Sequence, residues 1–378
     1  MLAVLLLHPV LSLALLGAIN LFGRVSRLSM AVWIAAYTVL VVSRQYGVDW
    51  SEESDDDAPI YFDLIARMVG KSLHTVLFDP DLAIDIEPLP KLYWWAAHAL
   101  TGSLSMVLVV QCALWTWALW HLCQNVARRH AVVALSIALF LIPTLASYEF
   151  LHLYRSAWAL FFIALALASQ FRESRGAYVW ALLAVASHVS AVVFVVALFA
   201  GRFWADGTFG WRHLLAGAAV IGVALLLGTE AITENVFVAK LVGYSAADAP
   251  GRALRIVKAV MLGLFFLVLY RMSPQKAGHR SALVCALLIV VISLVPALNA
   301  VSDRLITLYV PVMLIGLFPT GRPRWTALLL ALSTLRSISL LEADSVLRFS
   351  HGVLAYPLRV PMLDWAALLA NPPVWPGT

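Results

Sequence analysis

The stretch YVWALLAVASHVSAVVFVVALFA, residues 178–200, decides how the rest of this chain is interpreted. Its length matches the roughly 20 residues that an α-helix needs to cross the apolar core of a bilayer. Its middle, Ala186 to Ser190, is the most polar part of the run and contains His188. Irregular backbone at membrane depth is tolerated where it is buried in protein or lines a wet cavity. The stretch therefore predicts either one span or two half-length helices that reverse at His188.

The composition of the whole chain is typical of a polytopic integral membrane protein. Of its 378 residues, 62% are hydrophobic and 12% are charged, and the mean hydropathy is +0.88. Soluble domains usually carry about twice that share of charge. We expect one membrane domain over residues 1–378, an all-α bundle of about 10–12 helices. The other candidate spans are Leu2–Phe22, Leu28–Val42, Ser103–Cys123, Ala131–Ser147, Leu151–Gln170, Trp211–Gly228, Ala253–Tyr270, Ser281–Asn299, Arg304–Pro319 and Trp325–Leu341.

The net charge of +5 comes from arginines and lysines in short loops between the apolar runs. That pattern orients membrane helices with the basic loops on the cytoplasmic side. It is not a nucleic-acid surface, because no basic groove or RNA-binding signature is present. The three cysteines fit no metal or redox spacing. The acidic tract Glu52–Asp57 could bind a divalent cation, but it lacks the glycine turn and the spacing of an EF-hand loop. We expect neither a metal nor a cofactor. The basic loops are Arg24–Arg27, Arg128–His130, Arg172–Arg175, Arg271–Arg280 and Arg322–Arg324.

The loop charges set a condition on the number of spans. Three apolar runs separate Arg172–Arg175 from Arg271–Arg280, whereas an even number is needed to bring both loops to the same side. Reversal at His188 meets this condition and makes the loop Gly201–His213 cytoplasmic. The alternative is that Trp211–Gly228 does not span, and we prefer the reversal.

The opposite, outer side receives most of the acidic charge. Residues 44–90 form an acidic loop, and Asp49 to Glu87 contain eleven of the 21 acidic residues. Within this loop, residues 59–78 have an apolar stripe at helical spacing, which predicts an interfacial amphipathic helix. At the other end of the chain, residues 342–378 form a Pro-rich tail with no further span.

An unusual group of polar residues opens the Leu151–Gln170 run. Tyr148, His152 and Arg155 fall at i, i+4 and i+7, so they share one face of a helix. Arg155 offers a planar fork of donors suited to a phosphate. The simpler interpretation is that Arg155 reaches the lipid headgroups and pairs with Glu149.

Further polar residues stand in or next to other runs. His188 is suited to the role of a general base, although a histidine in a helix is often a packing residue. Arg304 begins a late run beside Asp303, which is equally consistent with a helix cap. Arg44 and Asp49 lie in SRQYGVDW just after the second run, where reaching the headgroups and a turn explain them equally well.

The order of these features resembles the EpsG family, within the Wzy-type polysaccharide polymerases. The resemblance rests on GVD after Arg44, on YRSAWALFFIALAL, LLAVASHVSAVVF and DRLITLYVPVML, and it covers residues 44–318. The family is similar in outline to GT-C membrane glycosyltransferases and O-antigen ligases. It usually has Arg-Gln where this chain has Arg155-Ser156, which puts in doubt any role for a side-chain amide there.

The resemblance implies a glycosyl transfer at the outer face of a bacterial inner membrane. Its substrate would be an undecaprenyl-diphosphate-linked oligosaccharide, and a flippase and a chain-length regulator of the same pathway would be its partners. Arg155, Arg304 and Arg44 would bind the diphosphate. His188, Asp49 or Glu149 would act as base, and Tyr148 and His152 would bind glycan.

Two other classes use similar residues. A transporter or flippase also carries arginine and histidine inside the membrane, but many transporters consist of two repeated halves, which this sequence lacks. A membrane acyltransferase that modifies a glycan is the third interpretation, because it also uses a histidine within a helical bundle.

Overall fold

The computed structural model describes twelve stretches of the chain, and every regular element in them is helical. No strand occurs in those stretches, which confirms the all-α expectation. They are residues 9–42, 58–79, 82, 88–102, 104–141, 154–188, 191–205, 252–274, 276–294, 299–318, 324–332 and 335.

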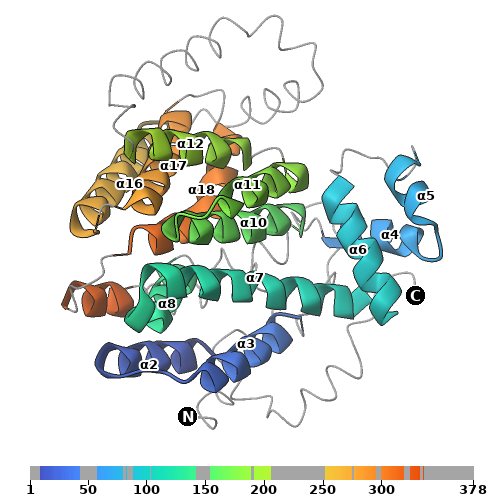
Figure 1. Ribbon diagram of the computed structural model, residues 1–378, viewed down its shortest axis with the longest axis horizontal. Coiled ribbons are helices and arrows are strands. Elements are labelled where there is room, and N and C mark those ends of the chain that lie inside the picture. The colour runs from blue at the N-terminus through green and yellow to red at the C-terminus, as the bar shows by residue number, and fades with distance from the viewer. Residues whose placement is uncertain are drawn as a thin grey trace, which may run out of the picture.

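The helices are stacked in layers (Figure 1). The first layer contains α2 (Pro9–Phe22) and α3 (Arg27–Val42), which pack on α8 (Ala131–Leu141) and α7 (Leu104–Val126). The central layer contains α10 (Tyr154–Phe171), α11 (Gly176–Ser187) and α18 (Asn299–Gly316). The last layer contains α12 (Val192–Ala205), α16 (Arg252–Met272) and α17 (Ala277–Ser293). The core is contiguous, because buried side chains from every layer join one cluster.

The helix break at His188 that the sequence predicted is confirmed. α11 ends at Ser187, and His188 has an extended backbone with φ −163° and ψ 128°. The N–H of His188 still donates to the carbonyl of Ala184 at 3.0 Å, while its own carbonyl accepts from Ala191 at 3.0 Å. α12 then starts at Val192. At 12 and 14 residues the two helices are about 18 and 21 Å long, each shorter than a roughly 30 Å bilayer core.

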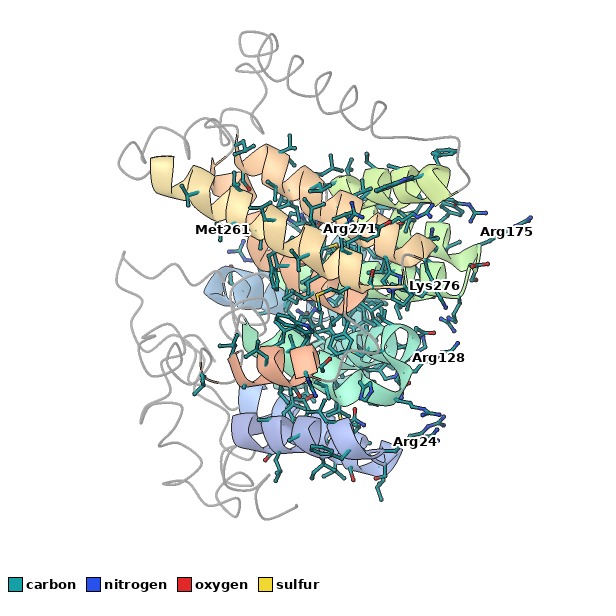
Figure 2. All side chains as sticks on the ribbon, turned by 90° about the vertical axis from the view of Figure 1, so that its left-hand side faces the viewer. Arg24, Arg128, Arg175, Met261, Arg271 and Lys276 are labelled. Carbon is teal, nitrogen blue, oxygen red and sulfur yellow. The ribbon has the colours of Figure 1, made fainter. Side chains whose placement is uncertain are left out.

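α11 and α12 run antiparallel, so the start of α11 and the end of α12 lie next to each other. The Arg202 guanidinium lies 5.7 Å from the centre of the Tyr178 ring. Beyond it, the Arg280 Nη1 donates to the carbonyl of Trp204 at 2.9 Å, which ties α12 to the start of α17. Basic loops from distant parts of the sequence therefore meet at one end. Figure 2 shows Arg24, Arg128, Arg175 and Lys276 along this end, which we call the basic end.

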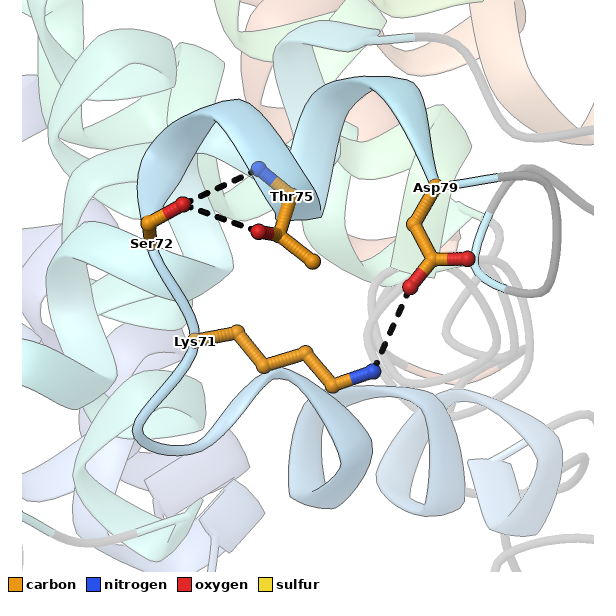
Figure 3. A network of polar contacts seen from close by, with 4 residues as sticks. All are labelled: Lys71, Ser72, Thr75 and Asp79. Carbon is orange, nitrogen blue, oxygen red and sulfur yellow. Dashed lines mark hydrogen bonds and ion pairs between the residues drawn. The ribbon is translucent and has the colours of Figure 1, made fainter.

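The prediction of a single amphipathic helix over residues 59–78 is wrong, because a turn divides this segment into two helices. The chain forms α4 (Ala58–Met68) and α5 (Leu73–Phe78), separated by a turn. The turn contains Gly70 at φ +72°, a conformation that favours glycine. Ser72 then caps α5, because its Oγ accepts from the N–H of Thr75 at 3.2 Å (Figure 3). Amphipathic spacing continues across the turn, which is why it suggested one helix.

Four residues of the apolar stripe pack inside the protein, whereas Val69 and Leu73 of the same stripe are exposed. Leu64, Ile65, Met68 and Val76 are buried inside the protein. α4 and α5 pack on α6 (Pro88–Thr101), and the Trp95 indole donates to the carbonyl of Lys71 at 3.0 Å. In the polar linker, Lys71 pairs with Asp79 at 3.4 Å (Figure 3). This side of the stripe therefore contacts protein rather than a membrane surface.

None of the helices in the described stretches combines the length and the apolarity that a single membrane crossing requires. Several sequence predictions fall outside these stretches, namely the run Trp211–Gly228, residues 44–57 of the acidic loop and the tail 342–378.

Candidate functional site

α10 and α18 place two of the predicted arginines at matching positions. Both helices run towards the basic end, where a Cβ on Gly316 would lie 2.9 Å from Leu167 Cδ2. Arg155 lies 12 residues before Leu167, and Arg304 lies 12 residues before Gly316. At 1.5 Å per residue, each arginine stands about 18 Å from this contact. The two backbones are therefore level with each other on packed helices, at the end opposite the basic end, which we call the far end.

α11 brings His188 to the same level. It runs antiparallel to α10, with the rings of Phe162 and Trp180 stacked at a centroid distance of 6.0 Å. From this contact, Arg155 is seven residues away along α10 and His188 is eight residues away along α11. Those separations correspond to about 10 and 12 Å in the same direction. His188 is half-buried, and its extended backbone ends α11 at this point.

An aromatic cluster from α6 and α7 packs beside the start of α10. The Gln111 Oε1 accepts from the indole of Trp94 at 3.1 Å and from the indole of Trp158 at 3.0 Å. The Tyr93 ring packs against Trp158, which lies one turn after Arg155. Because this amide holds two indoles from different helices, it fixes α6 against the far end. Figure 1 shows α6 beside the ends of α10 and α11.

α6 also contributes a buried cation. The side chain of Lys91 is only 3% exposed, and it makes no hydrogen bond or ion pair with any described residue. Burial lowers the pKa of Lys91, since the charged ammonium loses water. Two residues further along α6, the hydroxyl of Tyr93 is also buried without a partner in the described part of the chain. A buried lysine without a partner among the described residues is costly, so Lys91 becomes a candidate for binding an anion.

Lys91 and Tyr93 were not among the predicted site residues, because α6 did not resemble a span. A local signal was present, since Pro88 and Pro90 lie in the first turn of α6, where proline is well tolerated. Of the predicted site residues, His188 is described in full and Arg155 and Arg304 by their backbones alone. Arg44, Asp49, Tyr148, Glu149 and His152 lie outside the described stretches.

The arrangement brings the backbones of Arg155 and Arg304 to one end of the bundle, where Lys91 and His188 also lie. An arginine side chain offers a planar fork of donors to an anion, and Lys91 adds a third nitrogen group. Histidine is the side chain that most often serves as a general base. A set of this kind is suited to an anionic substrate that loses a proton during reaction.

Comparison with known proteins assigns the chain to a family. The sequence profile described as the EpsG family matches residues 32–332, which includes every predicted site residue. No curated protein and no solved structure gives a significant match. The family suggests a function in polysaccharide biosynthesis of the polymerase type, with glycosyl transfer as its general reaction. On this evidence the chain belongs to the EpsG family.

Proposed function

We propose that this protein polymerises lipid-diphosphate-linked oligosaccharide repeat units at the far end of the bundle. The observation that carries the proposal is the shared level of Arg155, His188 and Arg304 on three packed helices. The donor is an undecaprenyl-diphosphate-linked glycan in the outer leaflet of a bacterial inner membrane. The product is a longer surface or exopolysaccharide chain on lipid.

The location in a membrane is supported by apolar side chains on the outermost helices. On α16, the exposed residues Val257, Val260, Met261, Leu264 and Val268 follow helical spacing, and Met261 is 61% exposed. α12 has a second stripe of the same kind, formed by Val192, Val196, Phe199 and Phe203. In water such stripes would promote aggregation, whereas in a bilayer they are solvated by lipid tails. The basic end would face the cytoplasm and the far end the exterior.

In the proposed reaction, a sugar hydroxyl of one lipid-linked unit attacks the anomeric carbon of the other. The new C–O bond forms as the bond from that carbon to the diphosphate oxygen breaks. The hydroxyl proton passes to His188, and the lipid diphosphate leaves with its negative charge. Arg155 and Arg304 stabilise this charge, with Arg44 as a third candidate. Asp49 or Glu149 would take the proton if His188 serves only to orient the acceptor.

The proposal is tested in a strain that lacks the protein, complemented by variants. Arg155→Ala and His188→Ala should leave single repeat units on lipid and abolish long polymer, which gel electrophoresis of the glycan detects. Arg155→Lys should restore part of the polymer, because it retains the charge but not the planar fork. Arg175→Ala, at the basic end, is the matched control and should leave the polymer normal.

Each alternative outcome has a distinct meaning. Normal polymer length in both alanine variants would overturn the assignment of these residues. If lipid-linked units fail to reach the outer leaflet in the deletion strain, the protein acts as a flippase instead. A polymer of normal length that lacks only an acyl group would identify an acyltransferase.

A further inference from the structure

A cleft at the basic end has no part in the proposed glycosyl transfer. Its volume is about 580 Å³, within the range of ordinary small-molecule sites. Four of the described residues that line it are the arginines Arg24, Arg27, Arg128 and Arg129. None of those lining residues is acidic. The cleft therefore gathers like charges without a counter-charge of its own.

The two loops that supply these arginines are held together by one buried side chain. The Asn20 Oδ1 accepts from the N–H of Val132 at 3.2 Å, and its Nδ2 donates to the carbonyl of Gly23 at 3.2 Å. Asn20 is 4% exposed. Because this amide joins the α2–α3 loop to the start of α8, the convergence of the arginines is built into the packing.

The arginines themselves are available for a ligand. All four are exposed, and within the described part of the chain none forms an ion pair or a side-chain hydrogen bond. Arg128 has φ +42°, a left-handed conformation that is unfavourable for a side chain of this size. Such strain often marks a functional position. Guanidinium groups bind phosphate oxygens through paired hydrogen bonds, so the matching ligand is a phosphate anion.

Exposed apolar side chains on α2 and α3, which supply Asn20 and Arg27 to the cleft, indicate what carries the phosphate. On α2, Leu15, Ile19 and Phe22 follow helical spacing and are 41%, 43% and 94% exposed. Leu28, directly after Arg27, is 74% exposed. In a bilayer this surface is covered by acyl chains, so a phosphate that belongs to a lipid can occupy the cleft while its own chains lie on α2.

We propose that this cleft binds the phosphate headgroup of an anionic lipid, whose acyl chains lie along Leu15, Ile19 and Phe22 of α2. The site is independent of the proposed polymerase reaction, because it lies at the other end of the bundle. Basic loops that only orient helices need net charge alone. A lipid site differs from such loops, because the affinity for the lipid depends on the specific arginines around one cleft more than on equal charges at other positions.

The test uses the full-length purified protein in neutral detergent, with lipid adducts counted by native mass spectrometry. Phosphatidylglycerol is the anionic probe, phosphatidylcholine the zwitterionic comparison and inorganic diphosphate the free phosphate. The double variant Arg128→Gln and Arg129→Gln should bind phosphatidylglycerol about ten-fold more weakly, because charge-assisted hydrogen bonds are lost. Arg24→Gln with Arg27→Gln tests the other loop and should give the same loss.

The control is the double variant Arg175→Gln and Arg271→Gln, which removes the same charge at exposed positions that do not line the cleft. Phosphatidylglycerol binding that is retained in the control and lost in either cleft variant supports the proposal. Equal loss in cleft and control variants would overturn it in favour of general charge attraction. Binding of free diphosphate without phosphatidylglycerol would overturn the lipid as the source, and binding of neither would overturn the site.

Discussion

The ring of Tyr178 near the start of α11 stacks on the ring of Phe199 late in α12, with centroids 5.0 Å apart. In one continuous helix, 21 residues would separate these two side chains by about 31 Å along the axis. The contact is therefore possible only because the chain reverses between them, at His188. The same reversal puts His188 at the far end and returns both neighbouring loops to the basic end.

This reversal predicts that Arg175 and Arg202 face the same side of the membrane. Single cysteines at these two positions, in a chain whose natural cysteines are replaced, should both react with an impermeant thiol reagent from the cytoplasmic side. The natural cysteines Cys112, Cys123 and Cys285 are buried, so conservative replacement by alanine or serine is feasible. Labelling of the two positions from opposite sides would mean that residues 178–200 cross the membrane once.

Lys91 should contribute to activity at the expense of stability. Replacing it by Lys91→Met removes the cost of burying an ammonium group, and we expect the apparent Tm to rise by about 2–4 °C, the shift that ~1 kcal/mol produces in a large domain. Polymer formation should fall on the order of 10²-fold if Lys91 stabilises the leaving diphosphate. Thermal unfolding and glycan length measure the two effects.

A matched control for this variant is Lys71→Met. Lys71 is half-exposed and pairs with Asp79 in the turn between α4 and α5. Its replacement should leave polymer formation unchanged. If Lys91→Met is as active as the unaltered protein, Lys91 has no role at the far end.

Gly201 is expected to tolerate no side chain. A Cβ at this position in α12 would lie within 2.6 Å of the backbone N of Ser281 in α17, so the two helices would have to separate. Gly201→Ala should lower the free energy of unfolding by about 1–3 kcal/mol, as overpacking does. Gly263→Ala in α16 is the control, since the nearest atoms to its Cβ would be those of Val290 at 3.5 Å, an ordinary van der Waals distance. Similar unfolding midpoints for the two variants would contradict the close α12–α17 packing.

The stability of the basic end should depend on pH through His279, in the first turn of α17 before the apolar run. Burial, with a smaller effect of the Lys276 charge, lowers the pKa of His279 from 6.5 to about 4. The stabilisation that depends on neutral His279 is fully present above pH 6.5. It is lost as pH falls towards 4, because the unfolded chain binds the proton at a higher pH than the folded protein does. The loss over this range is at most roughly 3 kcal/mol.

The variant His279→Asn isolates this effect. The Nδ1 of His279 accepts from the N–H of Lys276 at 3.2 Å, and an asparagine oxygen can replace this acceptor without titrating. Unfolding midpoints measured between pH 4 and 7.5 should therefore change less steeply with pH in the variant. An unchanged slope would assign the acid sensitivity to other groups.

Much of the fold could be predicted from the sequence where one strong signal decided it. The break at His188 was predictable because a polar point interrupts an apolar run and loop charges require an even number of crossings. The turn at Gly70 was not predictable in this way, since apolar spacing continues from α4 into α5. α6 was missed because Lys91 and two prolines interrupt its apolar character, although its packing buries Lys91 and Pro90.

The candidate site was predictable only in part, for a different reason. Arg155, His188 and Arg304 were identified one by one from their positions in apolar runs. Their common level depends on contacts such as Leu167 with Gly316, which join residues far apart in the sequence. The arginine cleft depends in the same way on the bond from Val132 to Asn20, across 112 residues.

The most direct test of the polymerase proposal is to measure release of lipid diphosphate by the purified protein in bilayers. The substrate is the lipid-linked repeat unit that accumulates in a strain lacking the protein. We expect one lipid diphosphate released for each new glycosidic bond, as the glycan lengthens by whole repeat units, and loss of both signals in Arg155→Ala and His188→Ala. Glycan that stays at one repeat unit, with no diphosphate lipid released by the unaltered protein, would contradict the proposed function.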